Sequence, residues 1–495
     1  MVEPVPTLRA SHPDGHPERW RILAVLCAAL CIVALDNTIL AVAVPRLGAA
    51  LGADETALQW ITAAYSLVLA ALLLPLAGLG DRFGRKGLLV VGLALFGVAS
   101  VAASLATTSG QLVAARALMG VGGAATMPAT LAVLGNVFAD HERGRAIAVW
   151  SGVASIAGGA GPLVGGFLLA HFWWGSVFLV NVPVIVGVFA AVVVLVPTSR
   201  DPASPPVDVV GSVLWAAALG LVLFALIEGG EAGGLDRRVL GAAAVGLGLL
   251  AAFAAWERRC DHPLLSPSVV AERRMQAGMV VVPVVFFCVF GAQFVLTQWL
   301  QGVQQLTPFV AGLCFVPNGV LIFTGSLVST RVVAAMGLAR AAAAGLVVLA
   351  GALVAGAAFH GGLAPVVVAI AVAGLGVGLA VPPGVELIMG SVAPDQAGQA
   401  AGINETIVEA GGAFGIAVTG TLLALAVGGV GTISPERLAG PEGAAARQHF
   451  TDALAVPLLA AAALCVVAAL AVVRLAGGIG RPDPRRSDPT GTVTS

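Results

Sequence analysis

Long apolar runs separated by short polar segments extend along almost the whole chain. A helix needs about 20 mostly apolar residues to cross a bilayer, and fourteen runs are about that long. We expect membrane-spanning helices at residues 22–47, 58–78, 88–107, 111–138, 146–172, 176–196, 209–229, 239–256, 275–300, 308–330, 341–360, 365–390, 400–428 and 453–475. The pattern predicts an all-α integral membrane protein with 14 transmembrane helices, and an even number places both termini on one side.

The composition supports a chain that lies in lipid. Of its 495 residues, 58% are hydrophobic and 10% are charged, and the mean hydropathy is +0.98. Soluble domains carry about 25% charged residues, so these charges are too few to cover a soluble surface. The net charge of -1 gives no sign of a nucleic-acid partner. Cys27 and Cys31 share a helix face without a histidine or a second cysteine pair beside them, so we expect no metal site.

The basic residues are distributed unevenly between the two sides. With the N-terminus inside, nineteen of the 25 Lys and Arg residues fall in inner segments, five fall in outer segments, and Arg116 falls within a span. Cytoplasmic loops of membrane proteins carry the excess of Lys and Arg. Both termini are therefore predicted to be cytoplasmic, in a multi-pass protein of the plasma membrane.

A weak internal repeat divides the chain into two halves. Shifting the sequence by 255 positions places Gly123, Pro128, Gly135 and Asp140 on Gly378, Pro383, Gly390 and Asp395. The fourth predicted helix then corresponds to the twelfth, and a central helix pair inserted between two six-helix bundles explains this step of eight. The predicted regions are a cytoplasmic tail at 1–21, an N-terminal six-helix bundle at 22–196, a linker with two extra transmembrane helices at 197–274, a C-terminal six-helix bundle at 275–475 and a cytoplasmic tail at 476–495.

A short polar turn joins the second and third predicted helices. Its candidate switch residues are Gly78, Asp81, Arg82, Gly84, Arg85 and Lys86. The glycines allow a tight turn between closely packed helices. Asp81 can accept from helix N-terminal amides or pair with an arginine in one conformation and not in another. A plain positively charged anchor is the alternative interpretation. A partial copy that lacks the acid follows the tenth helix, at Arg331, Gly337 and Arg340.

Four ionisable residues within the predicted spans are candidates for proton coupling. Asp36 lies near the middle of the first helix and Arg116 in the outer half of the fourth. A carboxylate at the bilayer centre is costly unless it is paired, hydrated or protonated, and an arginine there keeps its charge and needs an oxygen partner. Glu405 and Glu409 are four residues apart on the thirteenth helix, so they share a face, where two carboxylates disfavour joint ionisation. Glu386, near the inner end of the twelfth helix, is interpreted as structural, and a structural role for Asp36 is the alternative.

The fifth predicted helix contains the run Gly-Gly-Ala-Gly-Pro-Leu-Val-Gly-Gly from residue 158 to residue 166. Gly158, Gly161 and Gly165 fall three and then four residues apart and share one face, which Gly166 adjoins. That face has almost no side chains, so another helix can approach it closely, and Pro162 is expected to kink the span. A generic packing face of small residues is the alternative.

Five further polar or aromatic residues are candidates for a substrate cavity. Trp60 and Tyr65 lie on the second predicted helix, and Gln293, Gln298 and Asn318 lie on the ninth and tenth helices or near their connection. Hydrogen bonds between helices explain the amide side chains equally well. Anchoring at the membrane interface is the alternative for Trp60.

These motifs together resemble the fourteen-helix drug:proton antiporters of the major facilitator superfamily. The turn at 78–86 is similar to the loop between helices 2 and 3 of that superfamily, and the helix 5 run resembles its antiporter motif, which is typical of exporters. Asp36 with Thr38 in the first helix, the Arg116 run and the passages around Glu386 and Glu405 resemble further motifs of these antiporters. The resemblance implies a major facilitator fold and proton-driven export of drugs, antibiotics or related lipophilic small molecules by alternating access.

The same resemblance implies a transporter that is not an enzyme. Its expected partners are a small-molecule substrate, protons and the lipid bilayer, with no nucleic acid, and we expect a monomer. No phosphate-binding Gly-x-x-x-x-Gly-Lys-Ser/Thr loop is present, so no nucleotide or other cofactor is expected. A proton-coupled or facilitative importer on the same fold is the main alternative, and a membrane receptor or assembly factor that transports nothing is the second.

Overall fold

The computed structural model describes residues 16–198, 208–231, 236–265, 267–358, 362–392, 397–427 and 443–476, which form helices and turns with no strand among them. The first half contains α2 (Arg19–Leu51), α3 (Glu55–Phe83), α4 (Arg85–Ser104), α5 (Ser109–Val137), α6 (Asp140–His171), α7 (Ser176–Leu179) and α8 (Asn181–Leu195). A central group follows, with α9 (Val209–Glu231), α10 (Arg237–Glu257) and α11 (Pro267–Val270). The second half contains α12 (Arg273–Gln298), the π-helical turn η1 (Trp299–Val303), α13 (Pro308–Leu313), α14 (Val316–Met336), α15 (Leu338–Ala358), α16 (Leu363–Met389), α17 (Ala397–Ala426), α19 (Gly443–Ala453) and α20 (Ala455–Ala476).

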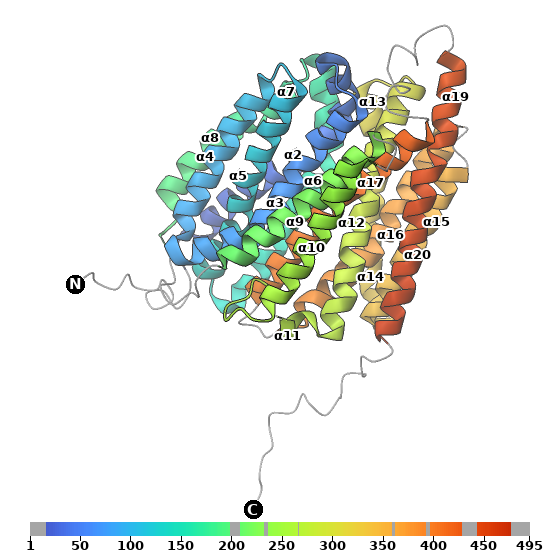
Figure 1. Cartoon of the computed structure of the whole chain (residues 1–495). Coiled ribbons are helices and arrows are strands. Elements are labelled where there is room, and N and C mark those ends of the chain that lie inside the picture. Colours follow the sequence, from blue (N-terminus) through green and yellow to red (C-terminus); the bar gives the residue numbers. More distant parts are fainter. Residues whose placement is uncertain are drawn as a thin grey trace, which may run out of the picture.

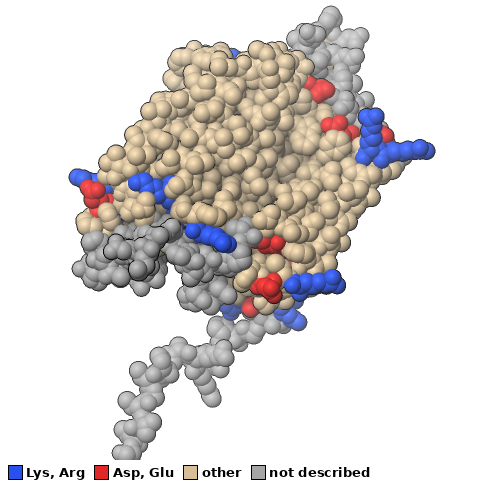
Figure 2. All heavy atoms as spheres, turned by 60° about the vertical axis from the view of Figure 1, so that its left-hand side comes forward, with Lys and Arg blue, Asp and Glu red and all other residues tan. Residues whose placement is uncertain are grey.

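The helices are long and apolar enough for a multi-pass membrane protein. Over the described residues, and with adjoining short helices joined, thirteen can cross a membrane, and each matches a predicted span. The 32-residue helix α6 occupies the position of the remaining one, the fifth. Large apolar side chains such as Leu105, Val194 and Phe323 are at least 65% exposed. In Figure 2, charged side chains leave a broad uncharged band across the face that is shown, as expected for a surface in contact with lipid.

Two of the predicted spans consist of two helices in succession, α7 with α8 and α13 with α14, and the last predicted span, α20, follows directly on the additional helix α19. In each pair the second helix carries a proline in its first turn, at Pro183, Pro317 and Pro457. Proline lacks a backbone N–H, and its ring clashes with the carbonyl four residues earlier, so it is tolerated in the first turn of a helix and not in the interior. The first helix of each pair therefore ends before the proline, and the second begins one or two residues before it. α19 begins at Gly443, ten residues before the predicted start of the last span at residue 453.

The same packing pattern occurs in both halves, which lie side by side in Figure 1, blue to teal on the left and yellow to red on the right. In the first half α5 packs against α3 and α4, and α2 packs against α6. In the second half α16 packs against α14 and α15, and α12 packs against α17. α5 and α16 therefore hold equivalent positions, as the 255-residue shift predicted. The short turns are also equivalent, because Gly84 alone joins α3 to α4 and Gly337 alone joins α14 to α15, with φ of 124° and 85°.

The central pair covers the seam at which the two halves meet. α9 contacts α3 from the first half and α17 from the second, and α10 packs mainly on α9 (Figure 1). Trp60 Nε1 donates to Glu228 Oε1 of α9 at 3.1 Å. From the other half, Thr421 Oγ1 donates to the Leu226 carbonyl oxygen at 2.9 Å. α9 is thus bound to both bundles, and α10 is attached through α9.

Candidate functional site

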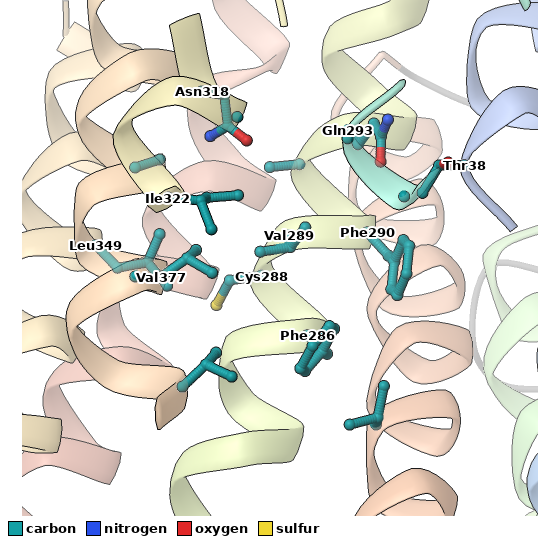
Figure 3. Close-up of a pocket in the computed structure, with 18 of the residues that line it drawn as sticks. Thr38, Phe286, Cys288, Val289, Phe290, Gln293, Asn318, Ile322, Leu349 and Val377 are labelled. Atoms are coloured by element: carbon teal, nitrogen blue, oxygen red, sulfur yellow. The ribbon is translucent and has the colours of Figure 1, made fainter. Parts of the chain in front are cut away.

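A cavity of about 750 Å³ lies between the two halves, lined mainly by apolar side chains. We call the end of the molecule at which α2 begins the inner end, following the sequence prediction, and the opposite end the outer end. Phe286, Phe290 and Gln293 project from one face of α12 into the cavity, with Thr38 of α2 across from them (Figure 3). The lining also includes Trp150 of α6.

The charged side chains that line this cavity are all acidic within the described part of the chain: Glu386, Glu405 and Glu409. Glu409 is 4% exposed, and Asn404 Nδ2 donates to Glu405 Oε1 at 3.4 Å. α17 thus presents both of its predicted acids to one space. Glu386 was interpreted as structural, but it is exposed and borders the same space at the inner end of α16.

A second group of polar residues is buried within the first half, outside the cavity lining. Asp36 and Arg116 are 0% and 1% exposed. The Arg116 guanidinium forms a salt bridge with Asp36 through Nη1, donates from Nε to the Ile61 carbonyl oxygen at 3.2 Å, and lies 4.4 Å from the centre of the Tyr65 ring. Asn181 Nδ2 donates to the other Asp36 oxygen at 3.0 Å.

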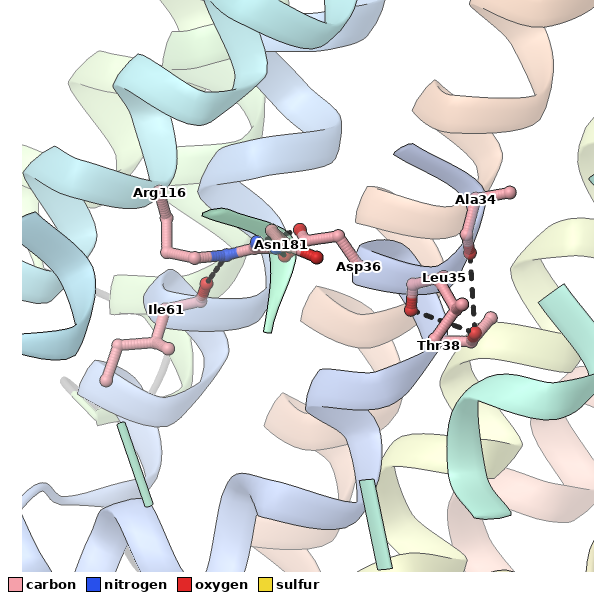
Figure 4. Close-up of polar contacts among 7 residues, drawn as sticks. All are labelled: Ala34, Leu35, Asp36, Thr38, Ile61, Arg116 and Asn181. Carbon is pink, nitrogen blue, oxygen red and sulfur yellow. Dashed lines mark hydrogen bonds and ion pairs between the residues drawn. The ribbon is translucent and has the colours of Figure 1, made fainter. Parts of the chain in front are cut away.

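The partners of Asp36 show which way each side of α2 faces. Figure 4 shows Asp36 directed toward Arg116 and Asn181, whereas Thr38 points to the other side of α2. The oxygen partner that Arg116 needs is supplied twice, by a carboxylate and a carbonyl. Sequence reasoning missed Asn181, although a single amide at the start of α8 in a long apolar run was a readable signal.

The glycines of α6 let three segments meet closely. A Cβ at Gly161 would overlap the Thr38 side chain, and one at Gly165 would lie 2.8 Å from the Ile39 carbonyl oxygen, so both glycines pack against α2. Gly166 instead faces the second half, where an added Cβ would lie 2.7 Å from Phe309 Cα. Gly158 was expected on the same packing face. It lines the cavity instead, and a Cβ added there would have no atom within 4 Å. Pro162 lies inside α6 and also lines the cavity.

The outer end of the cavity is closed by contacts between the halves, which we call the outer closure. It comprises the approach of Gly166 to α13, a bond from Gln298 Nε2 to Glu55 Oε1 at 3.1 Å, and a bond from Gln301 Nε2 to the Val42 carbonyl oxygen at 2.7 Å. Both glutamines come from the end of α12 and η1. Sequence reasoning missed Glu55, because an acid in the first turn of a helix is ordinary there.

Two of the five expected cavity residues line the cavity, Gln293 and Asn318, and three do not. Trp60 is bonded to Glu228 of α9, and Tyr65 is fully buried against Arg116 within the first half. Gln298 is part of the outer closure. The sequence did not distinguish these positions, because their helices are largely apolar and do not show which face meets the cavity.

The basic turn between α3 and α4 lies at the inner end. Arg85 Nη1 donates to the Ala132 carbonyl oxygen at 3.3 Å and Lys86 Nζ to the Val193 carbonyl oxygen at 2.8 Å, so α4 is held to the ends of α5 and α8. Arg82 is exposed beside the Phe83 ring, and Gly78 lies in the last turns of α3. The side chain of Asp81 lies outside the described part of the chain, so its switch role stays a prediction.

Within the described residues, no group of three or more His, Cys, Asp or Glu side chains is arranged to hold a metal ion. The six cysteines are free thiols. Cys288, which lines the cavity, lies with its sulfur 3.4 Å from that of Cys465.

Comparisons with known proteins agree with this architecture. The sequence model of the Major Facilitator Superfamily matches residues 26–416. The multidrug efflux pump LfrA of Mycolicibacterium smegmatis is 35% identical over 406 residues, covering 81% of this chain and 80% of that protein. The puromycin resistance protein pur8 of Streptomyces alboniger is 34% identical over 437 residues, covering 85% of each chain.

Among solved structures, a bacterial homologue of the human lysosomal transporter Spinster superposes with a TM-score of 0.66 at 16% identity, covering 93% of this chain and 97% of that chain. This likeness shows the fold. The expected all-α fold of two six-helix bundles with a central helix pair is confirmed, whereas the residue limits of the bundles stay a prediction. With the family match over most of the chain and relatives named for multidrug efflux and puromycin resistance, the protein belongs to the Major Facilitator Superfamily and is a membrane transporter, not an enzyme.

Proposed function

We propose that this transporter is a proton-driven antiporter that exports drugs, antibiotics or related lipophilic small molecules across the plasma membrane. The observation that carries the proposal is an apolar cavity whose charged lining residues, among those described, are three carboxylates. Apolar walls with a buried negative charge favour a lipophilic cation, and a proton on the same carboxyl group removes that attraction. Relatives in multidrug efflux and antibiotic resistance support export. The proposal also includes a monomeric state and a cytoplasmic location of both termini.

The coupling step is assigned to the pair Glu405 and Glu409, because both border the space that the substrate would occupy. A proton that enters from the outside neutralises this pair and displaces the substrate cation. Asp36 and Arg116 act at a distance from the substrate, as a charge pair that holds α2, α3 and α5 together. A proton on Asp36 would leave Arg116 without its counter-charge and favour another arrangement of the bundle.

Alternating access requires that the outer closure break while the inner end closes. Its two hydrogen bonds join one half to the other and contain no salt bridge, so they can exchange with water at modest cost. Rocking of the two bundles about the cavity then exposes the carboxylates to the outside.

The decisive experiment measures substrate-driven proton movement in everted membrane vesicles. Wild type is compared with Glu409→Gln and with Glu228→Gln, a matched change of a carboxyl group that bonds Trp60 outside the cavity lining. We expect Glu409→Gln to lose coupled transport and Glu228→Gln to keep it. Full efflux by Glu409→Gln under a proton gradient would remove Glu409 from the mechanism. Uptake stimulated by external acid, without protection of cells from toxic cations, would favour the importer.

A further inference from the structure

The cavity extends differently into the two halves. In the first half it is lined by α2, α5 and α6 and reaches neither α4 nor α8. In the second half it is also lined by α15 and by Leu458 of α20. The packing of the two halves makes α15 and α20 the counterparts of α4 and α8. The cavity therefore reaches α15 and α20 on the far side of the second bundle, but it does not reach the equivalent helices α4 and α8 of the first bundle.

α12 separates this extension from the central part of the cavity. Phe286 and Phe290 project from one face of α12, whereas Cys288 projects from another (Figure 3). Around Cys288, the side chains of Ile322, Leu349 and Val377 converge from α14, α15 and α16. We call this extension the side lobe; the cavity-lining residues that surround it include Cys288, Ile322, Leu349, Leu353, Ala369 and Val377.

The interior of the first half is filled where the second half is hollow. The first half holds Arg116 with its salt bridge to Asp36. The 255-residue shift places Ala371 at the position that corresponds to Arg116, and its neighbours Ala369 and Ile370 line the cavity. Small residues such as Ala352 and Gly356 also line the side lobe. Protein interiors are normally close-packed, so a hollow lined by small apolar groups and open to the substrate space indicates room for an apolar group.

We propose that the side lobe binds the aliphatic chain of an amphiphilic cation whose charged end faces Glu405 and Glu409. This inference rests on the proposed function of the same cavity and names the substrate class more closely. The side lobe offers apolar contacts and no carboxylate, so a polar group there would lose its hydration without a matching partner. A methylene moved from water into such a site strengthens binding by about fourfold. Binding should therefore rise with chain length until the lobe is full.

The test is equilibrium binding of octyl-, dodecyl- and hexadecyltrimethylammonium to the purified full-length protein. Ala352→Phe fills the side lobe from α15, and Val347→Phe is its matched control, because Val347 is on the same helix and 56% exposed on the outer surface. We expect wild type and the control to prefer the hexadecyl over the octyl compound, and Ala352→Phe to lower this preference at least about tenfold, the loss of roughly two methylenes. Ala352→Val adds less volume and should shift the preference in the same direction; it decides the test if the Phe variant does not fold.

An unchanged preference in the folded Ala352 variants would overturn the proposal. The absence of any chain-length preference in wild type, with lipid copurified in the cavity, would overturn it as well, since the lobe would then hold a membrane lipid. Binding is measured without a proton gradient, so the test is separate from the proposed export. Loss of efflux with an intact preference would refute proton-driven export alone, and normal efflux with no preference would refute the side lobe alone.

Discussion

Replacing Gly166 by alanine should shift the protein toward a state that is open at the outer end. An added Cβ would lie 2.7 Å from both Phe309 Cα and the Pro308 carbonyl oxygen, and these backbone atoms belong to the other half. Separations below 3.0 Å are not tolerated by a Cβ, so α6 and α13 must move apart. Overpacking of this kind costs about 1–3 kcal/mol. The cost applies only while the outer closure is formed, so the open state gains about 5- to 150-fold in relative population.

The matched control is Gly152→Ala on the same helix, where an added Cβ meets no atom within 4 Å. Both substitutions change the intrinsic helix preference equally, by about 0.5–1 kcal/mol in favour of alanine, so a difference between them reports the contact alone. Spin labels at Gly110 and Ala364, exposed positions at the outer ends of α5 and α16, measure the separation of the halves in a background whose native cysteines are replaced.

We expect a longer distance population in Gly166→Ala and the wild-type distribution in Gly152→Ala. Equal distributions in the two variants would refute the idea that the Gly166 contact closes the outer end. A loss of folded protein in Gly166→Ala alone would show that the contact is needed for folding, and it would refute the assignment of the cost to one conformational state.

Three further predictions concern the charge pair, the basic turn and the cavity. Asp36→Asn removes the counter-charge of the buried Arg116 and should lower the unfolding free energy by about 3–5 kcal/mol. The double variant with Arg116→Met should recover part of this loss. Thermal unfolding of the purified proteins checks this, and a wild-type melting temperature in the single variant contradicts it. Gly84→Ala places a residue with a Cβ at a backbone φ of 124° and should lower the unfolding free energy by about 1–3 kcal/mol. Gly87→Ala, whose added Cβ meets no atom within 4 Å, should lower it far less in the same assay. Binding of a lipophilic cation should weaken as the pH falls in wild type, since protons remove the negative charge, and the double variant Glu405→Gln/Glu409→Gln should bind weakly and with a smaller pH dependence; an unchanged pH dependence in the double variant would exclude the pair.

The helices could be predicted from the sequence because apolar length is the dominant signal in a membrane protein. The breaks near Pro183 and Pro317 were readable by the same rules of backbone chemistry but were hidden within continuous apolar runs, whereas the break before Pro457 follows the polar helix α19. The pairing of α5 with α16 was also predictable, because glycine and proline positions repeat in helices that pack alike.

The site was predicted in part. Asp36 and Arg116 could be paired in advance, since each is costly in a bilayer without the other. Which face of each helix meets the cavity could not be predicted, because lipid and protein interior are both apolar and leave little amphipathic pattern in the sequence. Tyr65 was therefore expected in the cavity and is packed against Arg116 instead. The side lobe depends on small residues of α15 and α16 that look like ordinary packing residues in the sequence.

The attachment of α9 to both halves limits how the two bundles can rotate against each other. Trp60 and Thr421 bind α9 from opposite halves, and both bonds survive only if α9 lies near the rotation axis, where displacements are smallest. The displacement of a rigid body grows with distance from its axis, so the largest excursion falls on the opposite flank, where α6 meets α13. In the rocking motion proposed above, the flank covered by the central pair therefore moves least, and the flank where α6 meets α13 separates most when the outer end opens.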